Sequence, residues 1–395
     1  MKIVSCTVTP VSVAYARREV SSVVERDGVT AGIVRIETDT GLVGWGETCA
    51  GADMESVLAA ARAMVPFVLG RDPWRGEQMR RELWRYGLWE FREPTANFAW
   101  AGIDMALWDL CGKEAGRPLY DLLGGAVRDE VDYFWYLGGA TLEELRADAA
   151  EGSARGYRCF YLKVGRALAE DAERLFAVRA VIGDKALLRI DANEAWSLPE
   201  AVTALKHLGA ARLDFVEQPV SHYPVDLLRR VANATGVVVA ANEGLWTEEA
   251  ALGRVLADAA DVYCFSPYWV GSLARFVRLG HLIERRGALV CKHTHGELGI
   301  AASACQHAML TLPGIVEGNQ QTAAEMTGDL LRTPIPIVRG PRWGRPTGPG
   351  LGVEIDEDAL AAAAARYLAH GQYLPYQVPS APSGGIAAGY EQEQA

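Results

Sequence analysis

From about residue 130 the chain repeats one pattern eight times, and this repeat constrains the fold more than any other feature. Each repeat has a short run of β-branched or aromatic residues, a loop, and a longer stretch of helical character rich in Ala, Leu and Arg. The runs are "VDYFWYL", "CFYLKVG", "ALLRIDAN", "LDFVEQP", "GVVVAANE", "DVYCFS", "GALVCKHTH" and "GIVEGN". Their spacing of roughly 25 residues is that of one βα unit, and eight units close a barrel. The runs are apolar almost to their ends, as in parallel strands buried on both faces. We therefore predict an α/β fold with a TIM-type barrel.

The residues before the barrel, roughly 1–125, have a different character. The segment "AGIVRIETDTGLVGWGE" predicts two strands around a turn, and the start "MKIVSCTVTP" alternates with period two, which favours a strand over a secretion signal. Ile103, Ala106, Leu107 and Leu110 are spaced for a helix that ends at Gly116. After the barrel, a Gly/Pro-rich turn region precedes an Ala-rich helix, and "PSAPSGGIAAGYEQEQA" reads as a flexible tail.

The charge and cysteine content exclude several classes of function. With 39 Lys and Arg against 50 Asp and Glu the net charge is −11, and no block of five like charges occurs, so we expect no nucleic-acid partner. No apolar run reaches the ~18 residues of a membrane helix. Seven cysteines without a C-x-x-C pair fit buried, reduced thiols. We expect a cytoplasmic protein with no membrane contact. No glycine-rich phosphate-binding motif indicates a nucleotide cofactor.

Ionisable or amide residues end most of the predicted strands. They are Lys163, Asp191, Glu217, Asn242, Glu243, Lys292, His293 and Glu317. Active sites of such barrels lie at the carboxyl ends of the strands. A single acid at a strand end is usually a helix cap, but capping does not explain successive strands that end in ionisable groups. We predict that these residues form the site.

Asp191, Glu217 and Glu243 end three consecutive strands, and Asn242 could take the third place instead. Carboxylates without nitrogen or sulfur ligands suit Mg²⁺ rather than zinc. The alternative is an internal ion-pair network, but only lysines 163 and 292 end other strands, and three converging carboxylates without a metal would repel one another. We predict a Mg²⁺ site.

Tyr161 and Lys163 are two residues apart on one strand, so their side chains share a face. Burial is expected to lower the pKa of Lys163 and make it a general base; the alternative is a structural lysine that neutralises the acids. His293 and His295 are also two apart. A zinc-hydrolase pair is the less favoured interpretation, because further histidine ligands are missing from strand ends. We prefer His293 as a proton donor or acceptor opposite Lys163.

These motifs resemble the enolase superfamily, closest to the mandelate racemase and acid-sugar dehydratase branch. The matching segments are "GIVRIETDTGLVGWGE", "ALWDLCGKEAGRPLYDLLGG", "ARGYRCFYLKVG", "RIDANEAWS", "VEQP" and "GSLARFVRLGHLIERRG". The resemblance implies a (β/α)7β barrel at residues 126–344. It also implies an α+β capping domain, formed by residues 1–125 with the C-terminal segment 345–395.

The resemblance further implies that the three strand-end acids bind one Mg²⁺ and that Lys163 abstracts the proton α to a carboxylate, giving an enediolate. Glu317 matches a position where the racemase branch keeps an acid hydrogen-bonded to substrate. Two residues depart from the pattern: Tyr161 replaces the first Lys of K-x-K, and Ser266 stands where an Asp would orient His293. The sixth strand does not end in Lys, which argues against the muconate cycloisomerase and dipeptide epimerase branch.

We therefore expect a Mg²⁺-dependent dehydratase, a lyase that acts on a sugar acid or hydroxylated amino acid. In this hypothesis Lys163 is the base, and His293, helped by Tyr161, protonates the departing β-hydroxyl. The expected substrate contacts are Asn193, Glu317, Tyr136, Lys292 and His295. The alternatives are a racemase or epimerase, a lactone cycloisomerase, and an inactive metal-binding paralogue.

The expected partners are a small-molecule carboxylate and further copies of the chain in a homo-oligomer. Cap loops at 15–30 and 48–56 are expected to set the substrate. Tyr133, Trp135 and Trp269 suggest a ring-bearing or compact substrate, although core packing explains these aromatics at least as well.

Overall fold

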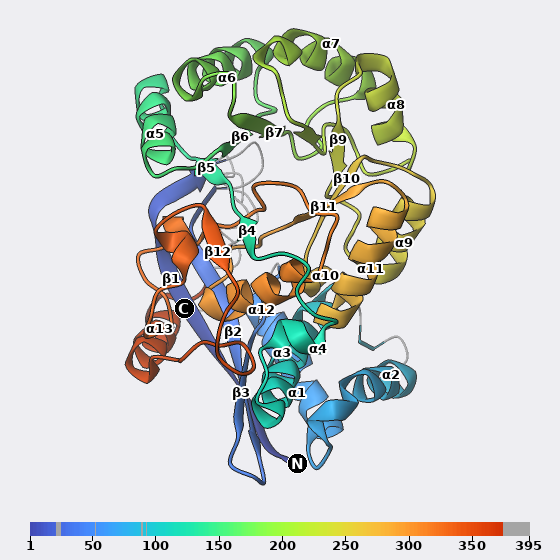
Figure 1. Ribbon diagram of the computed structural model, residues 1–395, viewed down its shortest axis with the longest axis vertical. Coiled ribbons are helices and arrows are strands. Elements are labelled where there is room, and N and C mark those ends of the chain that lie inside the picture. Colours follow the sequence, from blue (N-terminus) through green and yellow to red (C-terminus); the bar gives the residue numbers. More distant parts are fainter. Residues whose placement is uncertain (21–24, 52, 88–89, 92, 374–395) are drawn as a thin grey trace, which may run out of the picture.

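The computed structural model describes residues 1–395 except 21–24, 52, 88–89, 92 and 374–395 (Figure 1). A parallel sheet ringed by helices forms one part of the molecule, and a three-stranded antiparallel sheet with its own helices forms the other. The predicted flexible tail, 379–395, and parts of the two expected substrate loops lie outside the described residues.

The N-terminal sheet has the order β1-β2-β3 and confirms the predicted strands. Its elements are β1 (Ile3–Val20), β2 (Glu25–Thr38), β3 (Val43–Glu47), α1 (Met54–Val68), the 3-10 turn η1 (Pro73–Arg75), α2 (Gly76–Gly87), α3 (Thr95–Ala115) and α4 (Leu119–Leu122). Helix α3 ends as predicted at Gly116, whose φ of 64° is left-handed. A Cβ at Gly46 would lie 1.9 Å from the carbonyl oxygen of Gly102, so glycine lets β3 press against α3.

Seven parallel strands form the barrel sheet in the order β11-β10-β9-β8-β7-β6-β5. They are β5 (Trp135–Leu137), β6 (Cys159–Lys163), β7 (Leu187–Asp191), β8 (Val216–Glu217), β9 (Val239–Ala241), β10 (Val262–Phe265) and β11 (Leu289–Lys292). The helices between and after them are α5 (Leu142–Ala154), α6 (Leu168–Ile182), α7 (Leu198–Leu208), α8 (Leu227–Thr235), α9 (Glu248–Leu256), α10 (Pro267–Val270), α11 (Leu273–Arg285) and α12 (Gly299–Leu310). Capping boxes at Thr141/Glu144 and Ser197/Glu200 start α5 and α7.

The eighth run closes the barrel without forming a regular strand. Ile315 makes a parallel bridge with Val290, and Asn319 makes one with Tyr133, so the segment joins β11 to the chain just before β5. The first run also divides: β4 (Glu130–Asp132) pairs with β12 (Arg342–Gly344) outside the barrel, and β5 lies within it. The predicted barrel class is confirmed, with seven regular strands and a closing segment.

The C-terminal helix α13 (Glu357–His370) packs against β1, far from it in sequence (Figure 1). Short 3-10 turns, η2 (Gly209–Ala211), η3 (Ala323–Glu325) and η4 (Pro336–Val338), complete the described elements. The predicted domain limits at residues 125 and 344 stay predictions. No helix among the described residues has the length and apolar character needed to cross a bilayer.

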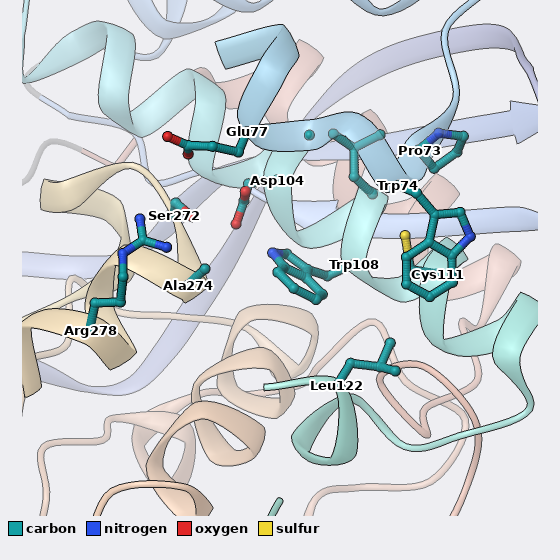
Figure 2. A pocket seen from close by; sticks show the side chains of 12 residues that line it. Pro73, Trp74, Glu77, Asp104, Trp108, Cys111, Leu122, Ser272, Ala274 and Arg278 are labelled. Atoms are coloured by element: carbon teal, nitrogen blue, oxygen red, sulfur yellow. The ribbon is translucent and has the colours of Figure 1, made fainter. Parts of the chain in front are cut away.

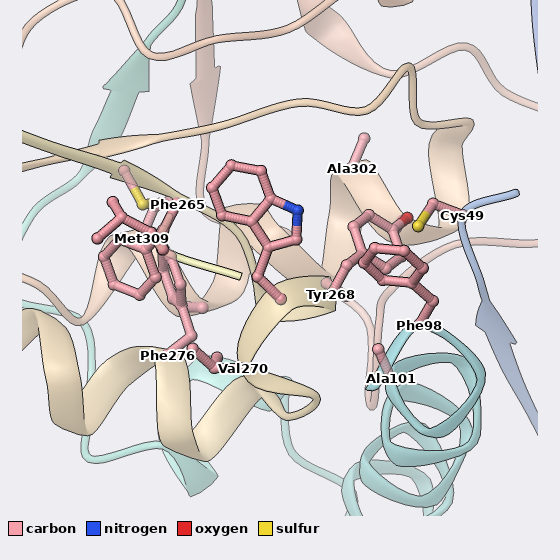
Figure 3. Packing of buried hydrophobic residues seen from close by; sticks show 14 of the residues in the cluster. Cys49, Phe98, Ala101, Phe265, Tyr268, Val270, Phe276, Ala302 and Met309 are labelled. Carbon is pink, nitrogen blue, oxygen red and sulfur yellow. The ribbon is translucent and has the colours of Figure 1, made fainter. Parts of the chain in front are cut away.

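One apolar core runs through both parts of the molecule. Phe98 of α3 lies beside Tyr268 of α10 where the two parts meet, and Phe265, Phe276 and Met309 pack nearby (Figure 3). All seven cysteines are free and buried, as predicted. Tyr133 and Trp135 are also buried; the Tyr133 hydroxyl donates to Gln306, and the Trp135 indole donates to Asp148. These two aromatics serve the core rather than a substrate.

Candidate active site

Three acids occupy the carboxyl end of the barrel sheet. Asp191 and Glu217 are the last residues of β7 and β8 and lie side by side in the strand register. Glu243 follows β9 by two residues. Asp191 and Glu217 are almost fully buried. Lys163, the last residue of β6, is the register partner of Asp191 on its other side. The strand ends therefore bring the predicted acids and the predicted base together.

Asp191 is the most heavily contacted of the three acids. Its Oδ2 accepts hydrogen bonds from the Tyr161 hydroxyl at 2.6 Å and from the Lys163 Nζ at 2.6 Å. Its Oδ1 accepts from the backbone N–H of Asn193 at 2.8 Å. Both oxygens are thus held before any ligand arrives.

Asn193, a predicted substrate contact, links the base to the acids. Its Oδ1 accepts from Lys163 Nζ at 3.0 Å, and its Nδ2 donates to Glu243 Oε1 at 2.9 Å. Its φ of 45° lies in the left-handed region, which asparagine tolerates better than most residues. This backbone turn brings the amide back over the strand ends.

Glu217 and Glu243 each keep one buried carboxylate oxygen without a partner, Oε1 and Oε2 respectively. The other Glu217 oxygen accepts from the Gln320 side chain at 2.8 Å. Burial, followed by the charge of Asp191, raises the pKa of both glutamates. An unpaired buried carboxylate is costly, so these oxygens call for a cation or a proton.

The donor set fits Mg²⁺ by chemistry, because it consists of carboxylates with two unsatisfied oxygens. As the side chains stand, no three His, Cys, Asp or Glu of the described chain are grouped closely enough to hold a metal. Asn242 fits less well than Glu243, because its amide donates to the Cys264 carbonyl at 2.8 Å and points into the sheet.

The pKa of Lys163 differs from our expectation. Burial alone lowers it, but the charges of Asp191 and Glu217 outweigh burial, so the net pKa lies above the ordinary value. The prediction of a lowered pKa is wrong for this metal-free arrangement, because it neglected the acids that the fold places against the lysine. A divalent cation on those acids would offset the charges that raise it.

Tyr161 supports the acids rather than His293. Its ring stacks on the Phe134 ring with centroids 4.7 Å apart, and its hydroxyl donates a hydrogen bond to Asp191 Oδ2. Burial raises its pKa well above the ordinary value. Among the described residues, no hydrogen bond or ring contact joins Tyr161 to His293, so the expected help in protonating a leaving group has no support in the geometry.

His293 and His295 follow β11 in an aromatic setting. The His293 ring stacks on Trp269 with centroids 4.7 Å apart, and the two imidazoles lie 4.8 Å apart. Buried His293 Nδ1 and His295 Nε2 have no hydrogen-bond partner. Burial, with the neighbouring cations, lowers the pKa of His293 well below its ordinary value. This direction favours the neutral imidazole as a proton acceptor, and the expected role of His293 as the acid stays a prediction.

Lys292 does not reach the site. Its side chain is 1% exposed and forms an ion pair with Glu297, and its Nζ also donates to the Gln320 carbonyl. Side chains alternate along a strand, so Lys292 faces the helix layer while His293 faces the barrel mouth. The prediction that Lys292 contacts substrate is wrong.

Glu317, also a predicted substrate contact, does not lie at the site. It is exposed, and the next residue, Gly318, lies against Cys159 at the start of β6. Its carbonyl accepts from Arg189, which also pairs with Asp214 before β8. Glu317 therefore lies at the amino end of the barrel. The closing segment continues three residues further, and Gln320 is the residue that reaches Glu217. The run of amide side chains "NQQ" at 319–321 is the sequence signal that could have indicated a polar contact here.

Cap residues approach the barrel mouth from β1 and β2. Arg26 pairs with Glu19 at 2.8 Å and donates to the His295 carbonyl at 3.0 Å. Tyr136, a predicted substrate contact on β5, is buried and its hydroxyl has no hydrogen-bond partner. Burial, followed by the charge of Glu19, raises its pKa well above the ordinary value. Sequence reasoning named the cap loops but missed Glu19 and Arg26, because no local pattern shows which cap residues face the barrel.

A cavity of about 350 Å³ lies away from these strand ends, between η1, α2, α3 and α11 (Figure 2). Glu77 and Ser272 stand at one side and Trp74 at the other, with Trp108 between them. None of the strand-end acids lines it. The cavity is thus separate from the candidate active site.

Comparison with known proteins agrees with this architecture. Residues 3–124 match the mandelate racemase/muconate lactonizing enzyme N-terminal domain, and residues 144–359 match the enolase C-terminal domain-like family. The chain belongs to the mandelate racemase/muconate lactonizing enzyme family of the enolase superfamily, whose members include dehydratases, racemases and cycloisomerases.

Two curated relatives and one solved structure illustrate this range. N-succinyl-L-Arg/Lys racemase of Bacillus cereus is 30% identical over 83% of this chain and 88% of its own. D-galactonate dehydratase of Ralstonia pickettii is 29% identical over 82% and 88%. An enolase from Thermobispora bispora, solved with magnesium and formate, is 26% identical with a TM-score of 0.86, covering 95% of this chain and 96% of that one.

Proposed function

We propose that the chain is a Mg²⁺-dependent dehydratase of a hydroxy-carboxylic acid. The observation that carries the proposal is the position of the Lys163 amine. It lies 2.6 Å from Asp191, among acids whose free oxygens on Glu217 and Glu243 lack partners. A base beside a carboxylate cluster suits removal of a proton α to a carboxylate. The likeness to D-galactonate dehydratase supports elimination as the outcome.

Asp191, Glu217 and Glu243 are the residues that would hold the metal. When bound, Mg²⁺ supplies positive charge where the substrate carboxylate gains negative charge. The relative solved with magnesium and formate supports this cofactor.

The proton balance is carried by Lys163. A divalent cation on the acids would offset the charges that raise the pKa of Lys163 and so favour its neutral amine. That amine takes the α-proton, and the electron pair of the C–H bond moves toward the substrate carboxylate. The β-hydroxyl then leaves with a proton from the Lys163 ammonium, as water, and the enol product tautomerises to a 2-keto acid. This assignment differs from the expected one, in which His293 protonates the leaving hydroxyl, and the lowered pKa of His293 supports the change.

The test is a panel of sugar acids and hydroxylated amino acids, incubated with the full chain and Mg²⁺ and assayed for 2-keto acids. We expect product with at least one acid and a loss of about 10²–10⁴-fold in Lys163→Ala, the usual worth of a general base. Lys206→Ala, at an exposed lysine of α7, is the matched control. Equal keto-acid formation by Lys163→Ala and wild type would refute the assignment.

A second candidate is 1,1-proton transfer, a racemase or epimerase reaction. It is favoured by neutral His293, which follows β11 on the arc of the barrel opposite β6 and Lys163. The racemase relative supports it. Deuterium incorporation from solvent without any keto product would select this candidate. Mg²⁺ binding without exchange on any acid would instead indicate an inactive metal-binding paralogue.

A further inference from the structure

We propose that Trp269 is a positioning residue that holds His293 as a proton acceptor, in a setting where no carboxylate partners the imidazole. The inference rests on the second candidate function, in which His293 takes a substrate proton on the face opposite Lys163. It identifies Trp269, rather than an acid, as the group that fixes the orientation of this histidine.

The geometry of Trp269 provides the first support. Its indole lies nearly parallel to the His293 ring, at 26° and 4.7 Å, and contacts the His295 ring edge-on at 5.2 Å. Trp269 is 4% exposed, so the indole is itself fixed by packing. Its carbonyl accepts from the Asn97 side chain at 2.7 Å, which ties α10 to cap helix α3. The indole is thus a rigid surface shared by two imidazoles.

The absence of an acid at the expected position provides the second support. Phe265 pairs with Lys292 in the register of β10 and β11, so the next pair along the strands is Ser266 and His293. Ser266 is fully buried, and neither its Oγ nor His293 Nδ1 has a hydrogen-bond partner. Without a carboxylate on Nδ1, the imidazolium form has no counter-ion in this arrangement.

The charges that face His293 act in the same direction. Burial is the largest influence on its pKa, followed by His295, Lys163, Lys292 and Arg26, and each lowers the pKa. Three of these cations are paired: Lys163 with Asp191, Lys292 with Glu297 and Arg26 with Glu19. The pairing reduces the electrostatic effect of these cations on the imidazole. Burial without a counter-ion is therefore the main cause of the lowered pKa of His293.

The indole itself exerts a weaker, opposite influence. An imidazolium over the face of Trp is stabilised by the cation–π attraction. The cost of burying a charge without a partner is larger than this gain. The balance favours the neutral ring, with Trp269 acting through shape and exclusion of water.

The test is a ¹³C NMR titration of the histidine Cε1 signals in the full chain, with the His293 signal assigned by its loss in His293→Asn. In the wild type we expect His293 to stay neutral from about pH 6 to 9. In Ser266→Asp the nearby carboxylate should raise its pKa by about 1–3 units. Ser221→Asp, at an exposed position, should leave it unchanged.

Two substitutions at Trp269 separate stacking from mere bulk. Trp269→Phe keeps an aromatic face, so His293 should stay neutral. Trp269→Leu removes the face and admits water, so the pKa should rise toward its ordinary value. A wild-type His293 that titrates near or above pH 6.5, or a Trp269→Leu profile identical to the wild type, would overturn the proposal. The titration needs no substrate, so its result is independent of whether the dehydratase proposal holds.

A pH–rate profile gives the second readout once a substrate is known. Activity that needs neutral His293 falls only as the pH drops below the pKa of that residue. The acidic limb should therefore move to higher pH in Ser266→Asp. A limb that does not move, with an NMR-confirmed change in pKa, would show that His293 acts on no substrate proton.

Discussion

At the scale of single residues, the site depends on which side chain of a strand end faces the barrel. Asp191, Glu217, Lys163 and Asn193 come together as the sequence predicted. Glu317 does not. The family resemblance pointed to the closing segment, which does reach the site. The residue that reaches it is Gln320, three positions after Glu317, because those three residues carry the chain from the amino end of the barrel to the carboxyl end.

This correction leads to a prediction for metal affinity. Gln320→Leu removes the hydrogen bond that orients Glu217, so Mg²⁺ affinity should fall about 10–100-fold, as for other outer partners of metal ligands. Glu317→Gln should leave the affinity unchanged, because Glu317 is exposed at the other end. Calorimetric Mg²⁺ titration of both variants makes the comparison. A larger loss in Glu317→Gln than in Gln320→Leu would mean that the register described above is incorrect.

At the scale of elements, hydrophobic runs and their spacing predicted the barrel strands well, because each is a short apolar segment bounded by polar residues. The direction of each terminal side chain was harder to predict. Lys292 and His293 are adjacent at the end of β11, and alternation sends one to the helix layer and the other to the mouth. Both were assigned to the site, because sequence alone did not show where β11 ends.

The buried pair of Lys292 and Glu297 should therefore act on stability. Glu297→Ala leaves a buried ammonium without its counter-ion and should cost about 3–5 kcal/mol in the free energy of unfolding. Denaturant unfolding measures it. Glu354→Ala breaks an exposed pair with Arg332 and should change little. The double variant Lys292→Met, Glu297→Leu should recover much of the loss; no recovery would argue against an ion-pair origin.

At the scale of the whole molecule, the cap and the barrel meet around the same strand ends. Glu47 of β3 accepts from the backbone N–H groups of Leu298 and Ala301 at 2.8 and 2.9 Å, so the cap sheet caps the first turn of α12. Arg26 reaches the His295 carbonyl from β2. The sequence predicted two parts but could not predict these contacts, since they join residues about 250 positions apart.

Metal binding should be visible in global stability. A ligand that binds only the folded state at 100 times its Kd adds about 2.7 kcal/mol, so saturating Mg²⁺ should raise Tm by a few degrees and EDTA should reverse the change. In Glu217→Gln the shift should disappear. The metal-free variant should melt no lower than the wild type, since burial already disfavours the Glu217 carboxylate. An equal Mg²⁺ shift in Glu217→Gln would place the ion elsewhere.

The central claim is that Lys163 exchanges a proton α to a carboxylate beside these acids. Its most direct test is ¹H NMR of a panel of 2-hydroxy and 2,3-dihydroxy acids in D₂O with the full chain and Mg²⁺. We predict loss of the α-proton signal from at least one acid, through exchange or elimination, slower by about 10²–10⁴-fold in Lys163→Ala. The claim would be contradicted if Lys163→Ala lost the α-proton signal at the wild-type rate. It would also be contradicted if an enzyme shown to bind Mg²⁺ left the α-proton signal of every acid in the panel unchanged.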